Sequence, residues 1–442
     1  MGAPPGRLRL LGTRHSRSAY EIRDFLTRSV VEFDWTTIET DAQCQELLGT
    51  TILESRLPIV ELHDGTLLHD PTIDQIARRL GWVHQPRLPA YDVSIYGAGP
   101  AGLSAAVYAA SEGLKVVVVE REAVGGQAGT SSLIENYLGF PSGIRGAELA
   151  ERARQQAVDF GAEILLLREG VRKDWVDGQL RTVLADGAPL VATANICATG
   201  VEWRRLGLPG EERLLGSGLY YGSGTSEAPE CEGEDVYIVG GANSAGQAAM
   251  NMAEHARSVT MLVRGDRLSD TMSSYLVDRI AAEPRIHVRF GARVAALLGG
   301  DRLYGAAIED ADGRAEVETG RLFVCIGGAP NTDWASATRL ARDDQGFVVT
   351  GPDLTPDDLA ASEWSLDRAP FYLESSMPGA FAAGDVRHGS IKRVASAVGE
   401  GAMAVTLVHR YLAELEGRVS PRRSERRPDV AWDPTSAPGA PR

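Results

Sequence analysis

Residues Tyr91–Gly102 read YDVSIYGAGPAG, and this stretch decides the fold. The apolar residues 93–96 lead directly into Gly97-x-Gly99-x-x-Gly102, and an alanine-rich segment follows. An apolar run, a glycine turn and an alanine-rich run predict a strand, a tight turn and a helix. This order is typical of the first half of a βαβ unit that binds a dinucleotide.

Each glycine of the turn has a separate physical task. Gly97 permits the tight turn, Gly99 lets the backbone approach a pyrophosphate, and Gly102 lets the helix pack closely on the strand. Pro100 and Ala101 open the helix, whose free N–H groups and positive dipole end favour phosphates. We therefore expect residues 97–102 to bind the phosphates of a cofactor.

The second strand of the unit ends in an acid. The apolar run at 115–119 leads into Glu120, which lies 18 residues after Gly102. An acid about 20 residues beyond the glycine turn bonds a ribose hydroxyl in such units. Glu120 and its neighbour Arg121 are therefore predicted cofactor contacts.

Composition sets the class of protein. A chain of 442 residues that is 43% hydrophobic and 24% charged is an ordinary globular protein of two or three domains. The net charge of −15 disfavours nonspecific binding to nucleic acid. No apolar run is long enough to cross a membrane, and the first residues lack the apolar core of a signal peptide, so we expect a cytoplasmic protein.

The four cysteines point to neither a metal site nor a disulfide framework. They are Cys44, Cys197, Cys231 and Cys325, and no two of them are close in sequence. Structural zinc sites and redox dithiols need paired cysteines. We expect no metal.

A second βαβ unit follows at 235–264. A strand at 235–239 leads into the glycine-rich turn of Gly240, Gly241, Ala242, Asn243, Ser244 and Ala245, then a helix and a strand that ends at Arg264. Glu120 would repel a ribose 2′-phosphate, whereas Arg264, with Arg267 nearby, would attract one. We expect FAD in the first unit and NADPH rather than NADH in the second. The alternative for Arg264 is a solvated charge at a strand end.

Residues 7–88 resemble the glutaredoxin/thioredoxin fold. The order of predicted strands and helices, and a strand that opens at Leu57-Pro58 with a suggested cis peptide, carry this resemblance. That family has a Cys-x-x-Cys after the first strand, but the corresponding residues 13–18 read TRHSRS and contain no thiol. We expect the module to dock or position something rather than catalyse, with His15 a surface loop residue.

Over residues 90–415 the chain resembles the thioredoxin reductase family of pyridine-nucleotide flavoproteins. The motifs that carry the resemblance are Gly97–Gly102, Gly126-Gln127 with Glu135-Asn136, Ala198-Thr199-Gly200, Gly240–Ala245, Gly327 with Pro330-Asn331, Ala383-Gly384-Asp385 and Arg393–Ala395. The resemblance implies an α/β fold with two Rossmann-like domains, an FAD domain (90–205 and 325–415) being split by an inserted NAD(P)H domain (206–324). It also implies a homodimer and hydride transfer from NADPH to FAD. Residues 417–442 are predicted to be a disordered tail.

The resemblance also assigns residues around the flavin. It places Gln127 and Asn136 near the isoalloxazine and Asp385 on the ribityl chain or phosphates, and it points the N–H groups of Val394 and Ala395 at the flavin N1/O2 edge. The further flavin-site residues that it implies are Gly126, Thr199, Gly200, Gly384 and Arg393.

The sequence departs from the family in the second turn. Ala242 stands where the family has glycine, and its methyl group would crowd a pyrophosphate. Gly265 and Ser269 stand where further basic residues are usual. Both departures weaken the expectation of a nicotinamide cofactor.

A second departure concerns the redox dithiol. Thioredoxin reductases carry Cys-x-x-Cys about 14 residues before the second turn, where this chain reads Ser223-Gly224-Thr225-Ser226. Serine cannot exchange disulfides, and Cys231 is expected to be an ordinary loop cysteine. We therefore expect a thioredoxin reductase-like fold without thioredoxin reductase activity.

The remaining candidates for chemistry surround the expected flavin. Tyr220, Tyr221, Ser223, Ser226 and His388 are candidates to line an acceptor pocket, with His388 as a proton donor. The alternatives are plain packing for the two tyrosines and a structural role for the histidine.

Several functions remain open on the sequence. The leading hypothesis is an FAD-dependent NAD(P)H oxidoreductase that reduces a small molecule, a quinone or oxygen. The others are electron transfer to a carrier protein, as in ferredoxin–NADP reductases of this type, a flavin enzyme reduced by its own substrate, and a flavin-binding regulatory module without turnover. The acidic net charge disfavours an acidic ferredoxin as partner. The N-terminal module is a candidate docking surface for a carrier protein.

Overall fold

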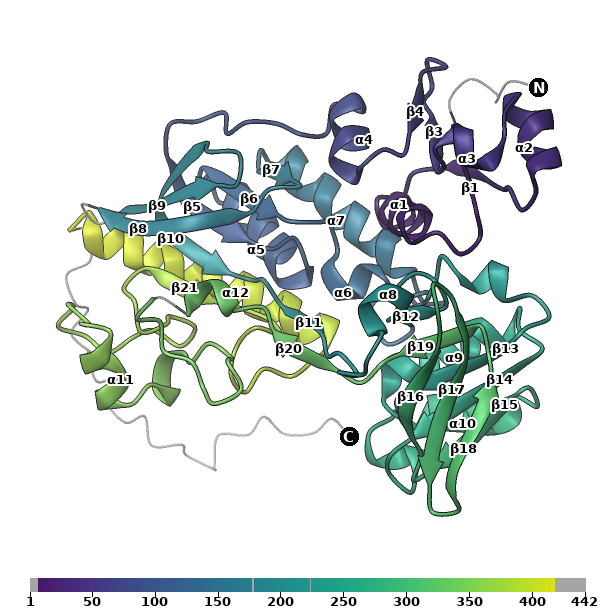
Figure 1. Cartoon of the computed structure of the whole chain (residues 1–442). Coiled ribbons are helices and arrows are strands. Elements are labelled where there is room, and N and C mark those ends of the chain that lie inside the picture. Colours follow the sequence, from purple (N-terminus) through teal and green to yellow (C-terminus); the bar gives the residue numbers. More distant parts are fainter. Residues whose placement is uncertain (1–6, 177–178, 223, 337, 418–442) are drawn as a thin grey trace, which may run out of the picture.

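The computed structural model describes residues 7–417 except 177–178, 223 and 337. Figure 1 shows three bodies: an N-terminal module in purple, a first domain that contains the long helix α12, and an inserted domain in teal and green. We define the module by β1 to α4, the first domain by β5 to β10 with β21 and α12, and the inserted domain by α8 to β19.

The N-terminal module is a four-stranded sheet with helices. Its strands are β1 (Leu8–Gly12), β2 (Phe33–Thr37), β3 (Ile59–Glu61) and β4 (Leu67–His69), in the order β2-β1-β3-β4. Strands β1 and β2 are parallel, and the other pairs are antiparallel. The helices are α1 (Arg17–Arg28), α2 (Asp41–Leu48), α3 (Ile52–Ser55) and α4 (Ile73–Arg79). The Leu57–Pro58 peptide is cis, as the sequence suggested.

The first domain is built on a mostly parallel sheet. The strand order is β7 (Glu163–Leu166), β6 (Val116–Glu120), β5 (Tyr91–Tyr96), β10 (Pro189–Cys197), β9 (Gln179–Leu184) and β8 (Gly170–Val176), and β21 (Ala380–Ala382) also pairs with β10. The helices of this domain are α5 (Pro100–Ser111), α6 (Gly126–Gly129), α7 (Gly146–Asp159), α11 (Pro356–Ala361) and α12 (Val394–Leu415).

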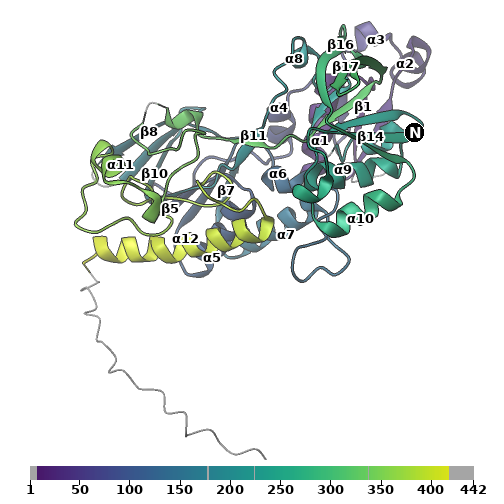
Figure 2. The same cartoon turned by 90° about the horizontal axis from the view of Figure 1, so that it is seen from below.

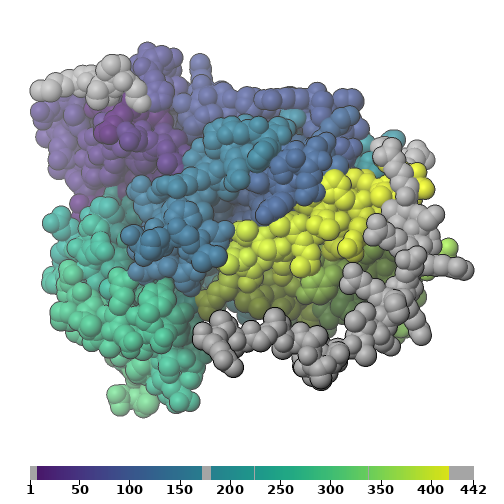
Figure 3. All heavy atoms as spheres, turned by 180° about the vertical axis from the view of Figure 1, so that it is seen from behind, coloured from purple at the N-terminus to yellow at the C-terminus, as the bar shows by residue number. Residues whose placement is uncertain are grey.

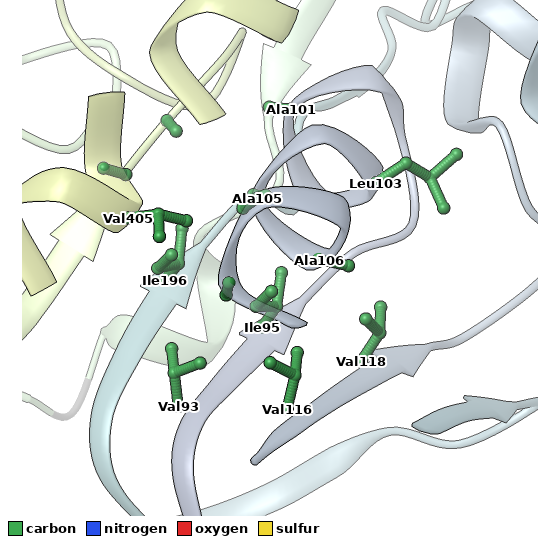
Figure 4. Close-up of a cluster of buried hydrophobic side chains, with 14 of the residues drawn as sticks. Val93, Ile95, Ala101, Leu103, Ala105, Ala106, Val116, Val118, Ile196 and Val405 are labelled. Carbon is green, nitrogen blue, oxygen red and sulfur yellow. The ribbon is translucent and has the colours of Figure 1, made fainter. Parts of the chain in front are cut away.

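The core of the first domain lies between the sheet and two helices. Figure 4 shows Val93, Ile95, Val116 and Val118 of the sheet under α5, with Val405 of α12 beside them. Helices α5 and α12 are in close contact because a Cβ at Gly401 would lie 2.2 Å from the Ala101 carbonyl oxygen. This packing brings the amino-terminal ends of both helices to one region.

The inserted domain has a second parallel sheet. Its order is β12 (Leu219–Tyr221), β19 (Arg321–Val324), β13 (Asp235–Val239), β14 (Ser258–Val263) and β15 (Ile286–Phe290). The antiparallel strands β16 (Arg293–Gly299), β17 (Leu303–Asp310) and β18 (Gly313–Glu318) form another layer, and the helices are α8 (Glu211–Leu214), α9 (Asn243–Ala253) and α10 (Ser274–Ala282). Short 3-10 turns lie at Ala228–Cys231, Leu268–Asp270, Asp333–Ala335 and Gly351–Asp353.

Two short strands join the two domains. The chain leaves the first domain along β11 (Val201–Trp203) and returns along β20 (Gly328–Pro330), and these strands pair antiparallel. Figure 2 shows this ribbon between the body that contains α12 and the body that contains α9 and α10. The inserted domain therefore interrupts the first domain in sequence. None of the helices in the described ranges is both long and apolar enough to cross a bilayer.

Candidate functional site

The first glycine turn requires glycine at two of its three positions. Gly97 has φ +103°, and a Cβ there would lie 2.3 Å from the Ala198 carbonyl oxygen. A Cβ at Gly102 would lie 1.9 Å from the Gly97 carbonyl oxygen. Gly99 differs, because a Cβ there would meet no atom within 4 Å. The turn thus leaves open space at Gly99, where a pyrophosphate would approach.

The start of α5 has unused hydrogen-bond donors beside this space. Gly99 is the N-cap and offers no side-chain cap, and Pro100 occupies the first turn of the helix. The N–H groups of Ala101 and Gly102 therefore point out of the helix end without a capping side chain. An uncapped helix end next to an open glycine fits the phosphates of a dinucleotide.

Glu120 holds the same turn from the end of β6. Its carboxylate accepts hydrogen bonds from the backbone N–H groups of Ala98, at 2.7 Å, and Glu122, at 2.8 Å. Burial raises the pKa of this carboxyl. Each carboxylate oxygen accepts more than one hydrogen bond, so the group can also receive a ribose hydroxyl. The Arg121 guanidinium is engaged elsewhere, 2.7 Å from a carboxylate oxygen of Glu202.

Three other predicted flavin-site residues tie loops together. A Cβ at Gly126, which has φ +53°, would lie 3.3 Å from the Gly99 Cα, so α6 packs directly on the first turn. The Gln127 amide donates a hydrogen bond of 2.9 Å to the carbonyl of Val201, at the start of β11. The Thr199 hydroxyl donates to the carbonyl of Asn331 at 2.9 Å. Gly200 adopts φ +64° beside Thr199, and Asn136 is exposed.

The start of α12 completes this region. A Cβ at Gly384 would lie 2.9 Å from the Ala101 Cβ, so the Gly384-Asp385 segment lies against α5. The carboxylate of Asp385 has no hydrogen-bond partner in the described part of the chain, and burial raises its pKa. Arg393 is the N-cap of α12 without a side-chain cap, which leaves the N–H groups of Val394 and Ala395 available.

These residues fit FAD. The structure gathers an open glycine turn, two uncapped helix ends and an unpartnered half-buried carboxyl, and they come from segments almost 300 residues apart. The residues that would hold the cofactor are Gly97, Gly99, Pro100, Ala101, Gly102, Glu120, Gly126, Gly384, Asp385, Arg393, Val394 and Ala395.

The second glycine turn has the same backbone but a different surface. A Cβ at Gly240, which has φ +142°, would lie 2.3 Å from the Cys325 carbonyl oxygen, and a Cβ at Gly241 would lie 2.7 Å from Val263. Ala242 is the N-cap of α9 in extended conformation and is exposed. Its methyl group occupies the place that Gly99 leaves open in the first turn.

The other residues of this turn have local roles. The Asn243 side-chain oxygen accepts from the Ser273 N–H at 2.8 Å, Ala245 is buried and Ser244 is exposed. Arg264 is exposed at the end of β14. Arg267 lies 2.8 Å from Asp270, so a carboxylate already neutralises much of its charge. Arg264 is left as the stronger candidate for a 2′-phosphate.

The two tyrosines at the end of β12 make internal contacts. Tyr220 is fully buried, its ring stacks on Phe323 at 5.0 Å, and its hydroxyl accepts from Arg321 at 2.8 Å. The Tyr221 hydroxyl donates to Glu211 at 2.5 Å and accepts from the Leu206 N–H at 2.9 Å. Burial and this carboxylate raise the pKa of Tyr221. These contacts give both tyrosines a packing role, and a catalytic role of Tyr221 stays a prediction.

The segment at 224–226 lies against the first domain. The Thr225 hydroxyl donates to the carbonyl of Thr130 at 2.7 Å, just after α6. The Ser226 hydroxyl donates to Glu227 at 2.7 Å. Burial raises the pKa of Glu227 to about 7, although Arg23 opposes the shift. Ser223 lies outside the described residues.

His388 follows β21 of the first domain, whereas the two tyrosines belong to β12 of the inserted domain. Its Nδ1 lies 2.6 Å from a carboxylate oxygen of Asp343, and its side chain is 45% exposed. The imidazole is therefore held by a carboxylate through Nδ1.

All four cysteines are buried. Burial raises the pKa of Cys231 and of Cys325 to about 12. Such thiols are poor nucleophiles at neutral pH. Within the described ranges, no three His, Cys, Asp or Glu side chains come together as a metal site would require.

Sequence reasoning missed the contact between the N-terminal module and the inserted domain. His15 is not a free surface residue: its carbonyl accepts from Ser217 at 2.8 Å, and burial, with Arg302 and Arg321 nearby, lowers its pKa to about 4. Arg23 pairs with the buried Glu227. The sequence contained one signal for this contact: Arg23, next to Ile22, is a charged residue on the apolar face of a helix.

Comparisons with known proteins agree with this geometry. The model of the pyridine nucleotide-disulphide oxidoreductase family matches residues 91–401. A thioredoxin reductase from Peptoclostridium acidaminophilum is 31% identical over 331 residues, which cover 73% of this chain and 97% of the relative. One from Listeria monocytogenes is 32% identical over 330 residues, covering 74% and 95%.

Solved structures give the same result. The crystal structure of a thioredoxin reductase from T. acidophilum has a TM-score of 0.65 at 29% identity and covers 74% of this chain and 100% of that one. The thioredoxin reductase of Lactococcus lactis has a TM-score of 0.64 at 25% identity, with coverage of 73% and 99%.

Proposed function

The chain belongs to the pyridine nucleotide-disulphide oxidoreductase family, with a thioredoxin reductase-like fold, and from this premise we propose that its electron acceptor is not a protein disulfide. In this proposal NADPH is the reductant, and bound FAD would take up the hydride and pass the electrons to a small molecule, a quinone or oxygen. The supporting observation is the segment at 223–226. Serine stands at both ends of it, and the Ser226 hydroxyl is bonded to Glu227.

The state of the thiols supports the same proposal. Cysteine sulfur must be accessible and deprotonated to exchange disulfides. All four thiols are buried, and the pKa values of Cys231 and Cys325 lie far above neutral pH. A protein disulfide therefore finds no exchange partner on this chain.

The preference for NADPH rests on Arg264. This guanidinium is exposed at the end of β14, where the corresponding strand of the first domain ends in Glu120. A guanidinium attracts a 2′-phosphate and a carboxylate repels one. Arg267 adds less than the sequence suggested, because Asp270 pairs with it.

His388 is the proposed proton donor to the acceptor. A quinone takes up two electrons and two protons, whereas a hydride supplies two electrons and only one proton. Asp343 fixes the His388 ring through Nδ1 and leaves Nε2 to deliver the second proton.

Ferricyanide separates this role from a structural one, because it accepts electrons without protons. We expect His388→Gln to slow quinone reduction by about a hundredfold and to leave ferricyanide reduction nearly unchanged. Equal losses with both acceptors would remove the proton-donor role. Asp343→Asn, which leaves the imidazole in place but loosens it, should show a smaller loss with the quinone alone.

Two alternative functions remain. A carrier protein and a regulatory module without turnover are the runners-up. However, residues 13–18 of the N-terminal module face the inserted domain, since the His15 carbonyl accepts from Ser217 and Arg17 donates to the Glu212 carbonyl. This loop is therefore a poor docking site for a carrier. A homodimer is proposed on the resemblance alone, and a cytoplasmic location on the sequence, which has no long apolar run and no signal-peptide core.

The test is anaerobic stopped-flow absorbance of the purified protein. Mixing with NADPH should bleach the flavin band rapidly, faster than NADH does, without the long-wavelength band that a thiolate beside the flavin produces. Turnover should then follow with a quinone or oxygen and not with a protein disulfide. Failure of both nicotinamides to bleach the flavin would remove the reductant assignment and favour a flavin enzyme reduced by its own substrate.

A further inference from the structure

The two nucleotide-binding domains are joined by a slender hinge. Only β11 and β20 pass between them, and each has three residues. A two-stranded ribbon of this kind permits one domain to rotate against the other. Among the described residues, direct contacts beyond the ribbon include the hydrogen bond from Thr225 to the Thr130 carbonyl and the pair of Arg279, 45% exposed, with Glu135 at 2.5 Å.

Helix α1 of the N-terminal module contacts the inserted domain through a buried ion pair. Arg23 is 3% exposed and lies 3.2 Å from Glu227, which is 1% exposed. The second guanidinium nitrogen pairs with Glu230, whose carboxylate also accepts from the indole N–H of Trp35 at 2.6 Å. Breaking a buried ion pair by removing one partner is strongly destabilising, because the other charge remains buried and unpaired.

Close packing accompanies the ion pair. The Tyr20 ring meets the Tyr220 ring edge-on at 5.2 Å. A Cβ at Gly216 would lie 3.0 Å from both the Arg17 Cα and the Tyr20 Cδ1, so the backbone of the inserted domain touches α1 directly. Figure 3 shows the purple module resting on the teal inserted domain and on the blue first domain with no gap between them.

The other end of α1 contacts the first domain. Arg28 donates to the carbonyl of Ala123 at 3.4 Å and lies 3.3 Å from a carboxylate oxygen of Glu122. Ala123 is buried in the same apolar cluster as Phe25 of the helix. In Figure 1 α1 is seen end-on between the first domain, at α6 and α7, and the inserted domain.

The segment that leaves the module is also fixed to the first domain. The Arg87 N–H donates to Glu163 at 3.0 Å, and Arg168 donates to the His84 carbonyl at 3.4 Å. The module is thus held to the first domain at α1 and at its exit, and to the inserted domain at Tyr20 and Arg23.

We propose that α1 is an internal clamp that holds the inserted domain at one angle to the first domain. A rotation about β11 and β20 would separate Arg23 from Glu227 while Arg28 stays on Ala123. The clamp opposes that motion because the charges of Arg23 and Glu227 would lose their partners. The inference concerns the domain angle and does not depend on which molecule accepts the electrons.

Single-molecule energy transfer between two dyes tests the clamp on the full chain with its cofactor. Since all four native cysteines are buried, Ser111→Cys on α5 and Asp278→Cys on α10 give two exposed labelling positions, one on each domain. Labelled chains are diluted with unlabelled chains so that transfer within one chain is measured. The unclamped chain is Arg23→Ala, and Arg78→Ala, on the exposed face of α4, is the matched control.

For the otherwise native chain and for the Arg78→Ala control, the clamp predicts one narrow distribution of dye distances. NADPH should not shift this distribution. Arg23→Ala should broaden or shift the distribution, with the flavin absorbance spectrum retained. Tyr20→Ala removes the ring contact without unpairing a charge and is measured in parallel. It should broaden or shift the distance distribution as Arg23→Ala does, but by a smaller amount. The proposal would be overturned if the distance distribution of the native chain were broad or moved with NADPH. It would also be overturned if the distributions of the Arg23→Ala and Tyr20→Ala variants stayed as narrow as that of the native chain.

Discussion

Single atoms decide how well the second glycine turn can hold a dinucleotide. Gly99 leaves open space beside the first turn, whereas the exposed methyl group of Ala242 occupies that space in the second. The extended conformation of residue 242, with φ −101° and ψ −179°, is open to any residue, so glycine is not needed there for the backbone. The methyl group therefore acts on the ligand and not on the fold.

Ala242→Gly should strengthen nicotinamide binding. Removing the methyl group lets the pyrophosphate approach the turn, and we expect a gain of about 1 kcal/mol, roughly fivefold in the NADPH concentration for half-maximal flavin reduction. The measurement is the NADPH dependence of the reduction rate in stopped flow. Ala361→Gly, at an exposed end of α11 in the first domain, is the matched control and should change nothing. A weaker affinity in Ala242→Gly would show that the methyl group contacts the ligand favourably.

The raised pKa of Glu227 makes stability depend on pH. Burial places this pKa at about 7, above the ordinary value of about 4.5, so the folded protein binds the proton more tightly than the unfolded chain. Between pH 4.5 and 7 the folded state holds more protons, and stability from this group falls as pH rises. The full loss of unfolding free energy from this group, on the order of 3 kcal/mol, is reached above pH 7.

Glu227→Gln isolates this effect because glutamine does not titrate. The stability of the native chain relative to Glu227→Gln should fall as pH rises from 5 to 7 and then level off, measured by thermal unfolding at each pH. Glu232→Gln, exposed on the same loop, should give a difference that does not vary with pH in this way. A flat difference for Glu227→Gln would contradict the raised pKa.

At the scale of elements, the contact of α5 with α12 shapes the region proposed to hold the flavin. The two helix ends converge only because Gly401 allows the Ala101 carbonyl to come close to α12. Gly399 lies two residues away on the same helix, and a Cβ there would meet nothing within 4 Å. The helix therefore contains a matched pair of glycines, of which one is required for packing.

The two glycines should respond to alanine with opposite signs. Gly401→Ala would place a methyl group 2.2 Å from a backbone oxygen, so we expect a loss of about 3 kcal/mol and weaker retention of FAD. Gly399→Ala should raise stability by about 0.5–1 kcal/mol, because alanine favours the helix and meets no obstacle. Thermal unfolding and the ratio of flavin to protein absorbance measure both effects. Similar behaviour of the two variants would show that α12 shifts to relieve the contact.

At the scale of the whole molecule, the three bodies enclose every thiol. Cys44 lies in the N-terminal module, Cys197 in the first domain, and Cys231 and Cys325 in or beside the inserted domain. Each thiol is buried in an apolar cluster of its own body, and the Cys231 thiol also donates to the carbonyl of Glu227, next to the interface with Arg23.

Thiol titration measures the accessibility of these cysteines directly. With an aromatic disulfide reagent the native protein should react slowly at all four cysteines, with or without NADPH, and four thiols should appear on unfolding. A denatured sample provides the control for reagent and count. One thiol that reacts rapidly after NADPH reduction would contradict the proposal of a non-disulfide acceptor.

The sequence alone determined the two glycine turns, the acid at the end of the second strand, Glu120, and the lack of any Cys-x-x-Cys motif. The physical reason is that these features are local: Gly97 needs its positive φ, and Gly102 must approach an atom five residues away. The family comparisons confirm the fold that those motifs predicted. By contrast, the partners of Tyr220 and Tyr221 and the partial burial of His15 followed only from the tertiary structure. Arg23 and Glu227 lie 204 residues apart, and no local pattern reports whether two such charges meet, because only the packing of the three bodies brings them together.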